Sequence, residues 1–327
     1  MDTLSDVLRS IRLTGAIFFD VRASAPWVAE TPAGRSIVGT MFPGSDHLML
    51  YHLMVRGEGW IAIPGEASLR LAAGDLIVLP HGDPHTLSSA PGLHSQPDMA
   101  LYQPPADRQL PVKISMGDVG QHSTEIVCGF LGCDRRPYNP LLTALPRMIH
   151  VSADQGGPLA TYVRIALAES MEPRPGGQSV LGHLSELMFV DVVRGYLETL
   201  PEGQSGWLAG LRDPYVGRAL AALHRAPGQG WTIESLAQRI GLSRSTLAER
   251  FTHLVGQPPM QYLTNWRMQL AANQLRGGTD NVAVIANRVG YESEAAFSRA
   301  FKKAAGAAPS AWRRHIESGH ADARAAR

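Results

Sequence analysis

The feature that most constrains this 327-residue chain is a pattern that occurs twice between Trp231 and Phe301. Each copy has a short amphipathic segment, a glycine and a second amphipathic segment. The first copy has the sequence LAQRIGLS, and its second segment ends with the apolar residues Leu247 and Phe251. The second copy has the sequence IANRVGYE, and its second segment ends with Phe297 and Phe301. Glycine adopts positive φ without steric cost, so each copy predicts two helices joined at a sharp turn. The chain therefore contains two predicted helix-turn-helix units, whose second helices can enter a DNA major groove.

Charge is distributed unevenly along the chain, although the formal net charge is only +1. Residues 214–315 carry thirteen Lys and Arg against five Asp and Glu, whereas residues 1–213 carry fifteen against twenty-two. A basic segment on an acidic body indicates a polyanionic partner for that segment alone; the alternative is an uneven surface without function. The hydrophobic content of 44% and the length are typical of a globular protein with two ordinary domains.

Membrane and secreted proteins have signatures that this sequence lacks. No apolar run approaches the roughly 20 residues of a membrane span. The first residues do not combine a basic stretch with an apolar core, as a signal peptide does. Two cysteines, Cys128 and Cys133, are too few for a secreted disulfide framework. We therefore expect a cytoplasmic protein that does not contact a membrane.

The N-terminal part follows a different pattern, in which short strands alternate with glycine- and proline-rich turns. A short helix at residues 4–11 precedes a strand at 16–21. Further strands are expected at 48–55, 60–63, 67–71, 76–79, 101–102 and 125–131. Many short strands at roughly ten-residue spacing predict an all-β sandwich or barrel. Residues 74–85, with Gly74, Pro80, Gly82 and His85, resemble the second cupin motif, but the His-x-His of the first cupin motif is not met.

Between these two parts, residues 159–171 and 180–200 carry helical periodicity. The apolar side of the second helix is read either as ordinary core or as a dimer interface. Residues 201–213, rich in glycine and polar residues, are the expected linker.

The second segment of each repeated copy predicts a recognition helix with one buried and one exposed side. Thr232 and Ser243 are suited to cap the helices of the first copy, and the second recognition helix is expected to start near Ser293. Helical spacing turns a defined set of side chains outward. This outward set includes Arg244, Ser245, Ala248 and Glu249 in the first copy and Glu294, Ala295 and Arg299 in the second.

The segment between the two copies, residues 258–275, predicts a single helix with apolar residues along one side. Eighteen helical residues span roughly 27 Å, so the two recognition helices can lie about one DNA turn, roughly 34 Å, apart. One chain would then read two successive major-groove segments on one face of a duplex.

This C-terminal region closely resembles the AraC/XylS family of bacterial transcription regulators. The motifs that carry the resemblance are Gly256-Gln257-Pro258-Pro259, Tyr262-Leu263, Trp266-Arg267-Met268, Ile285-Ala286, Val289-Gly290-Tyr291 and Phe297-Ser298-Arg299-Ala300-Phe301-Lys302-Lys303. The resemblance implies that the outward set makes the base contacts. Arg299 would then pair with guanine and Glu249 would accept from the amino group of cytosine. For Glu294 the alternative is a surface residue that contacts no base.

A cupin-like barrel in front of such a module resembles the family's arrangement of a sensor and a DNA reader, and some relatives respond to oxidants through cysteine. The candidate effector or metal-binding residues are His47, His52, His81, His85, His122, Cys128 and Cys133. Three alternatives stay open for the cysteines: packed thiols, a redox pair, or ligands that hold zinc or another divalent metal together with nearby histidines. A bridge between the cysteines needs a bend, because residues five apart on a straight strand face opposite sides.

The predicted fold is an α+β multidomain chain. It comprises a cupin-like β-barrel sensor domain at 1–150, helical linker and dimerisation helices at 151–213, an all-α double helix-turn-helix domain at 214–315 and a tail at 316–327. We expect a DNA-binding transcription regulator controlled by a small ligand, metal or oxidant. Its partners would be double-stranded DNA, RNA polymerase, a small-molecule or redox effector and a second copy of the chain. The alternative is a metal-dependent cupin enzyme with an appended DNA-binding module, which leaves the basic segment unexplained. The effector, the operator and the sign of regulation are left open.

Overall fold

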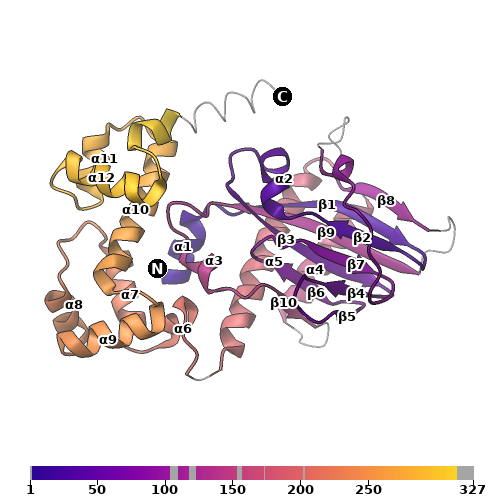
Figure 1. The fold of residues 1–327 in the computed structure, drawn as a ribbon, viewed down its shortest axis with the longest axis horizontal. Coiled ribbons are helices and arrows are strands. Elements are labelled where there is room, and N and C mark those ends of the chain that lie inside the picture. The colour runs from indigo at the N-terminus through magenta and orange to yellow at the C-terminus, as the bar shows by residue number, and fades with distance from the viewer. Residues whose placement is uncertain are drawn as a thin grey trace. The chain divides into compact units, whose positions relative to one another are not determined.

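The computed structural model of the chain describes residues 2–103, 110–117, 123–152, 157–172, 174–201 and 203–314 (Figure 1). The chain divides into two compact units. The β-sheet unit consists of Leu13–Cys133 and Leu145–Glu198, and the helical unit consists of Met1–Arg12, Asp134–Ala144 and Thr199–Arg327. The units therefore group residues differently from the linear division at 150 and 213, because two short segments of the N-terminal half belong to the helical unit.

The β-sheet unit contains two sheets, as the strand pattern predicts. One has the order β10-β6-β3-β9-β1-β8 and the other β2-β7-β4-β5, and every pair is antiparallel except β1 with β8. The strands are β1 (Thr14–Ala23), β2 (Val28–Thr31), β3 (His47–Arg56), β4 (Glu58–Ala62), β5 (Leu69–Ala72), β6 (Leu76–Leu79), β7 (His85–Ser88), β8 (Val112–Met116), β9 (Thr124–Cys133) and β10 (Ile149–Val151). The helices are α2 (Gly34–Met41), the 3₁₀ helix η1 (Met99–Tyr102), α4 (Pro158–Met171) and α5 (Gly177–Thr199).

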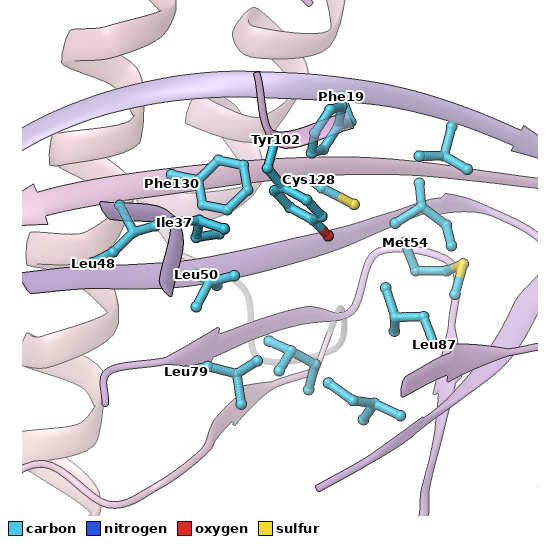
Figure 2. Close-up of a cluster of buried hydrophobic side chains, with 14 of the residues drawn as sticks. Phe19, Ile37, Leu48, Leu50, Met54, Leu79, Leu87, Tyr102, Cys128 and Phe130 are labelled. Carbon is cyan, nitrogen blue, oxygen red and sulfur yellow. The ribbon is translucent and has the colours of Figure 1, made fainter. Parts of the chain in front are cut away.

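Strand β3 shows how the sequence pattern positions the core. Alternate residues on a strand face opposite sides of the sheet. Leu48, Leu50 and Met54 belong to the apolar cluster between the sheets (Figure 2). Tyr51, on the other side of β3, reaches α5, where its hydroxyl lies 2.6 Å from Ser185 Oγ. Strand β3 is thus buried on both faces.

Helix α5 packs unusually close to the six-stranded sheet. A Cβ added at Gly15 on β1 would lie 2.6 Å from the carbonyl oxygen of Gly182 on α5. The backbone N–H of Gly15 also donates to Glu186 Oε1 at 3.2 Å. The absence of a side chain at both glycines lets helix and strand backbones approach directly. The predicted helices at 159–171 and 180–200 are confirmed as α4 and α5.

The helical unit contains the two helix-turn-helix pairs, α8–α9 and α11–α12, at either end of the long helix α10 (Figure 1). Its helices are α1 (Thr3–Ser10), α3 (Pro140–Ala144), α6 (Trp207–Arg212), α7 (Val216–Arg225), α8 (Ile233–Ile240), α9 (Arg244–Val255), α10 (Pro259–Gly277), α11 (Val282–Arg288) and α12 (Glu294–Ala305). Among the residues that the structure describes, no helix combines the length and the apolar character that crossing a membrane requires.

Two local expectations are wrong. Residues 101–102 lie in η1 rather than in a strand, because Asp98 caps this 3₁₀ turn by accepting from the N–H of Ala100. The expected linker at 201–213 contains α6, whose Trp207 and Leu208 are buried in the helical unit. The indole N–H of Trp207 donates to Tyr262 Oη at 2.9 Å, so a distant partner orders a segment that is locally polar and glycine-rich.

Candidate DNA interface and ligand cavity

The first helix-turn-helix pair is built from the capping signals that its sequence carries. Thr232 and Ser235 form a reciprocal capping box at the start of α8. Gly241 ends α8 with φ of 79°, in the left-handed region that glycine adopts without strain. Ser243 then starts α9 by accepting from the N–H of Thr246 at 3.1 Å. Three residues separate the two helices, which produces the sharp turn.

The second pair repeats this construction with different residues. Asn281 caps α11 by accepting from the N–H of Val284 at 2.9 Å. Gly290 has φ of 86°, and Ser293 caps α12 through the N–H of Ala296. The predicted start of the second recognition helix at Ser293 is therefore confirmed.

Both recognition helices bury one side and expose the other. Leu247 and Phe251 of α9, and Phe297 and Phe301 of α12, are fully buried. The predicted outward set lies on the opposite sides of these helices. Arg244, Ser245, Glu249, Glu294, Ala295 and Arg299 are exposed and Ala248 is half-buried.

The two recognition helices differ in how their positive charges are paired. On α9, Arg244 lies 3.1 Å from Glu234 and Arg250 lies 2.6 Å from Asp213. On α12, Arg299, Lys302 and Lys303 are exposed and have no ion pair within the described residues. Helix α12 therefore contributes more uncompensated positive charge than α9. Because unpaired cations attract phosphate most strongly, α12 is the stronger of the two in attracting the DNA backbone.

Helix α10 separates the two pairs and spans about 28 Å for its 19 residues. Its apolar side packs on both pairs, and Trp266 stacks on His224 of α7 with ring centroids 4.1 Å apart. Burial lowers the pKa of His224 to about 3, so this imidazole is neutral near pH 7. Helix α10, which sets the distance between the recognition helices α9 and α12, is thus held in place by its packing in the core.

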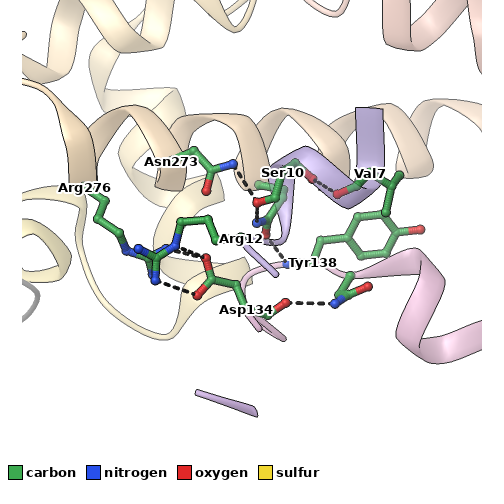
Figure 3. A network of polar contacts seen from close by, with 9 residues as sticks. Val7, Ser10, Arg12, Asp134, Tyr138, Asn273 and Arg276 are labelled. Atoms are coloured by element: carbon green, nitrogen blue, oxygen red, sulfur yellow. Dashed lines mark hydrogen bonds and ion pairs between the residues drawn. The ribbon is translucent and has the colours of Figure 1, made fainter. Parts of the chain in front are cut away.

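A buried polar cluster, which sequence reasoning missed, ties two other segments to α10 (Figure 3). We call Arg12, Asp134 and Arg276 the Asp134 cluster. Asp134 is 1% exposed, accepts from Arg12 Nε at 3.0 Å and pairs with Arg276 of α10. Arg12 also has φ of 52°, in the left-handed region that non-glycine residues rarely adopt.

Gln269 of α10 extends this network. Its Oε1 accepts from the N–H of Tyr138 at 3.1 Å, and its Nε2 donates to the carbonyl of Ser10 at 3.0 Å. Gln269 is fully buried, so both ends of its amide are satisfied where water does not reach. The sequence signal for this network is a polar row on a helix in the core: Gln269, Asn273 and Arg276 follow helical spacing.

The β-sheet unit contains a cavity of about 220 Å³ between its sheets. Most of its wall is apolar and includes Phe19, Trp27, Tyr102, Ile126 and Phe130. The rings of Phe19, Tyr102 and Phe130 meet edge to face with centroids 5.8 to 6.4 Å apart, next to the thiol of Cys128 (Figure 2). A cavity of this kind suits a small apolar molecule.

The structure brings only some of the seven predicted effector or metal residues together. His52 and Cys128 are cross-strand partners on β3 and β9, and both line the cavity. His85 is not among the residues that line the cavity, but its Nε2 atom lies 2.6 Å from Nε2 of His52. His47 and His81 instead contact the carbonyls of Pro80 and Leu145, at 2.7 and 2.9 Å. His122 lies outside the described residues.

Neither cysteine forms a disulfide within the described residues, and both are buried. The register of β9 against β3 is continuous from Cys128 to Cys133, so the odd spacing places the two thiols on opposite faces of the strand. Burial raises the pKa of Cys128 to about 12. A thiol with this pKa is protonated near neutral pH and is a poor nucleophile, which disfavours oxidant sensing at this position.

The described residues do not fit a metal centre with three or more protein ligands. No group of three or more His, Cys, Asp or Glu side chains among them is placed to hold an ion. His52 and His85 direct their Nε2 atoms toward each other rather than toward a common point. Zinc sites take at least three such ligands, so the arrangement favours a ligand cavity over a metal site.

Comparison with known proteins agrees with both halves of the structure. A family model described as cupin matches residues 2–198, and one described as a helix-turn-helix domain matches residues 236–315. A Streptomyces lividans protein described as an AraC-like transcription regulator is 35% identical over 320 residues, which are 96% of this chain and 99% of the relative. The transcriptional regulator AlkR of Acinetobacter baylyi is 29% identical over 93% of this chain and 96% of its own length.

Among solved structures, the DNA-binding domain of AdpA in complex with a target DNA is 31% identical, with a TM-score of 0.31, and covers 32% of this chain and 95% of that chain. The similarity to named regulators over nearly the whole of both chains confirms the prediction of a regulator rather than a cupin enzyme. The chain belongs to the family of AraC-like transcription regulators.

Proposed function

We propose that this regulator reads two successive major-groove segments of double-stranded DNA through α9 and α12, and that a small, largely apolar molecule in the cavity of the β-sheet unit controls it. The observation that carries the first part is the pair of recognition helices, each with an exposed polar side and a fully buried aromatic or aliphatic side. The regulator would act in the cytoplasm, at promoters where RNA polymerase is a further partner.

The base contacts are proposed for the outward set of residues on α9 and α12. Arg299 is the strongest candidate, since it is exposed on the helix with the most uncompensated charge and its guanidinium can bind guanine O6 and N7 together. Arg244 already pairs with Glu234, so reading a base would require exchanging that ion pair. Glu249, Glu294 and the smaller residues would shape the contact surface around them.

Arg299→Ala is expected to cost about 1–3 kcal/mol of binding free energy on the preferred operator and to relax specificity at one base position. The operator is first obtained by binding-site selection with the full chain, and affinities are then measured by fluorescence anisotropy on single-base variants. The matched control is Lys303→Ala, also exposed on α12. As a phosphate contact, it should weaken all sequences alike and reduce the salt slope by about 1. An equal loss on every sequence for Arg299→Ala would rule out base reading.

Ligand control is proposed because the cavity adjoins the strands that lead into the helical unit. Phe19 of β1 and Cys128 of β9 both line the cavity. Along the chain, Arg12 precedes β1 by two residues and Asp134 directly follows β9. The cavity strands are therefore continuous with two members of the Asp134 cluster, whose third member lies on α10.

A ligand would change DNA binding only if it bound two conformational states of the chain with different affinity. The connection between the cavity strands and the Asp134 cluster would let those states differ in the helical unit as well. The test is whether a small molecule that binds the cavity changes the affinity of the full chain for its operator. No change with any bound molecule would contradict ligand control.

Exposed apolar residues of α4 and α5 support a second copy of the chain as a further partner. Ile165 and Met171 of α4, and Val180 and Leu187 of α5, are between 41% and 71% exposed. Large apolar side chains that face solvent gain free energy when another protein surface buries them. In a two-fold dimer each such residue would contribute twice.

Leu187→Glu is expected to weaken dimerisation at least about tenfold, because two uncompensated carboxylates would enter the interface. Sedimentation velocity over a concentration series measures the change. Gln178→Glu is the control, since nine residues of helix place it roughly 180° from Leu187 and it alters the charge equally. If wild type and Leu187→Glu sediment alike at all concentrations, this face does not mediate dimerisation.

A further inference from the structure

Two side chains that line the cavity carry buried polar atoms that have no hydrogen-bond partner among the described residues. They are Trp27 Nε1, a donor, and His52 Nδ1. Trp27 is 3% exposed and His52 is 4% exposed, so bulk water does not satisfy them. Buried polar groups are nearly always paired, and those that are not require an explanation. For atoms of cavity-lining residues, the simplest explanation is a hydrogen bond to a molecule that binds in the cavity.

The hydrogen bonds behind His52 determine what its Nδ1 atom can do. His85 Nδ1 lies 3.0 Å from the carbonyl oxygen of Asp83, and a carbonyl only accepts, so His85 carries its proton on Nδ1. His85 Nε2 is then an acceptor, and His52 Nε2 must donate to it across 2.6 Å. His52 Nδ1 is therefore an acceptor. Burial keeps both rings neutral, because it lowers the pKa of His52 well below its usual value and that of His85 to about 4.

The described residues around the cavity offer no counter-ion to an anionic ligand. None of the described residues that line it is Lys or Arg. Its carboxylates are already engaged, since Glu30 accepts from Thr86 Oγ1 at 2.9 Å and Asp98 accepts from the N–H of Ala100 at 3.0 Å. An anion would lose its hydration next to two carboxylates and the neutral imidazole of His52. A neutral ligand is favoured.

We propose that the cavity binds a neutral molecule of about one aromatic ring, whose hydroxyl-type polar group accepts from Trp27 Nε1 and donates to His52 Nδ1. The apolar wall excludes larger polar molecules, and the volume of about 220 Å³ exceeds the roughly 150 Å³ that holds benzene in an engineered cavity. Phenols and small alcohols are the simplest molecules of this class. The inference rests on the proposed ligand control of the same cavity, to which it adds the chemistry of the ligand.

The test compares 4-methylphenol with p-xylene, which has the same shape but neither donor nor acceptor, and with 4-methylbenzoate, which is anionic. Calorimetric titration of the full chain is expected to give 4-methylphenol an affinity at least about tenfold above p-xylene, because only the phenol pairs the two buried atoms. The benzoate should not bind. Trp27→Phe and His52→Leu should each reduce the affinity for 4-methylphenol about tenfold and leave that for p-xylene within about twofold.

Retained p-xylene binding shows that a variant still folds. Equal wild-type affinity for the phenol and p-xylene, no binding of the phenol, or equal loss of both ligands in the variants would overturn the proposed ligand class. The operator affinity of the full chain, measured with saturating 4-methylphenol, separates the two hypotheses. If the phenol binds as expected but the operator affinity is unchanged, the ligand class stands and ligand control fails.

Discussion

Asp134→Ala is expected to release residues 2–12 and 134–144 from the rest of the helical unit, at a cost of about 3–5 kcal/mol. Removing one partner of a buried ion pair leaves the other charge uncompensated, which costs far more than the pair itself contributes. Here the charge left uncompensated is that of Arg276, whose side chain is 11% exposed. Arg12, whose side chain is 36% exposed, loses its contact with Asp134.

Native-state hydrogen exchange by mass spectrometry measures this release, because it reports opening segment by segment. Peptides from α1 and α3 should exchange several hundred-fold faster in the variant, whereas peptides from α8 and α9 should change little. Asp280→Ala is the matched control: Asp280 pairs with Arg288, and both side chains are more than 40% exposed. Exposed pairs contribute about 0–1 kcal/mol. Equal exchange of α1 and α3 in both variants would show that the Asp134 cluster does not hold these segments.

Gly129→Ala is expected to destabilise the β-sheet unit by about 3 kcal/mol, at the upper end of what overpacking usually costs. A Cβ at Gly129 of β9 would overlap the phenol ring of Tyr51, its cross-strand partner on β3. Tyr51 has little freedom to move. It is 2% exposed and donates to Ser185 Oγ, since the Ser185 hydroxyl already donates to the carbonyl of Leu181. The added methyl group must therefore displace the ring from α5 or separate two central strands.

Urea unfolding followed by circular dichroism measures this loss, with Gly195→Ala as a control of opposite sign. Gly195 lies inside α5 with nothing within 4 Å of an added Cβ, so alanine should stabilise the helix by about 0.4–1 kcal/mol. A second test is rescue: Tyr51→Ala should make Gly129→Ala nearly neutral, since the overlapping ring is gone. A similar loss in both backgrounds would show that the clash with Tyr51 is not the cause.

Elements with local causes could be predicted from the sequence. The capping box of Thr232 and Ser235, the left-handed Gly241 and the cap at Ser243 act within a few residues, so their positions follow from residue type and spacing. The buried and exposed sides of α9 and α12 follow from helical periodicity in the same way. Strands β3, β6 and β9 also lie close to their predicted limits, because each is a continuous apolar run bounded by turns.

Elements whose stability comes from distant partners could not be predicted. Helix α6 forms in a polar, glycine-rich stretch because Trp207 packs near Tyr262, 55 residues further along the chain. The strand expected at 101–102 is a 3₁₀ turn whose Tyr102 completes the aromatic wall of the cavity. Of the seven residues proposed for the effector or metal, composition alone did not distinguish His52 and Cys128, which line the cavity, from His47 and His81, which contact backbone carbonyls.

The sequence by itself determined that two copies of a helix-turn-helix unit stand on one long helix behind a domain rich in β-strands, because periodicity, caps and turns are properties of neighbouring residues. Only the tertiary structure decided which polar groups are buried together. Asp134 meets Arg12 across 122 residues and Arg276 across 142, and His52 meets His85 across 33. Such pairs leave no local pattern, since their partners come together only when the chain folds around them.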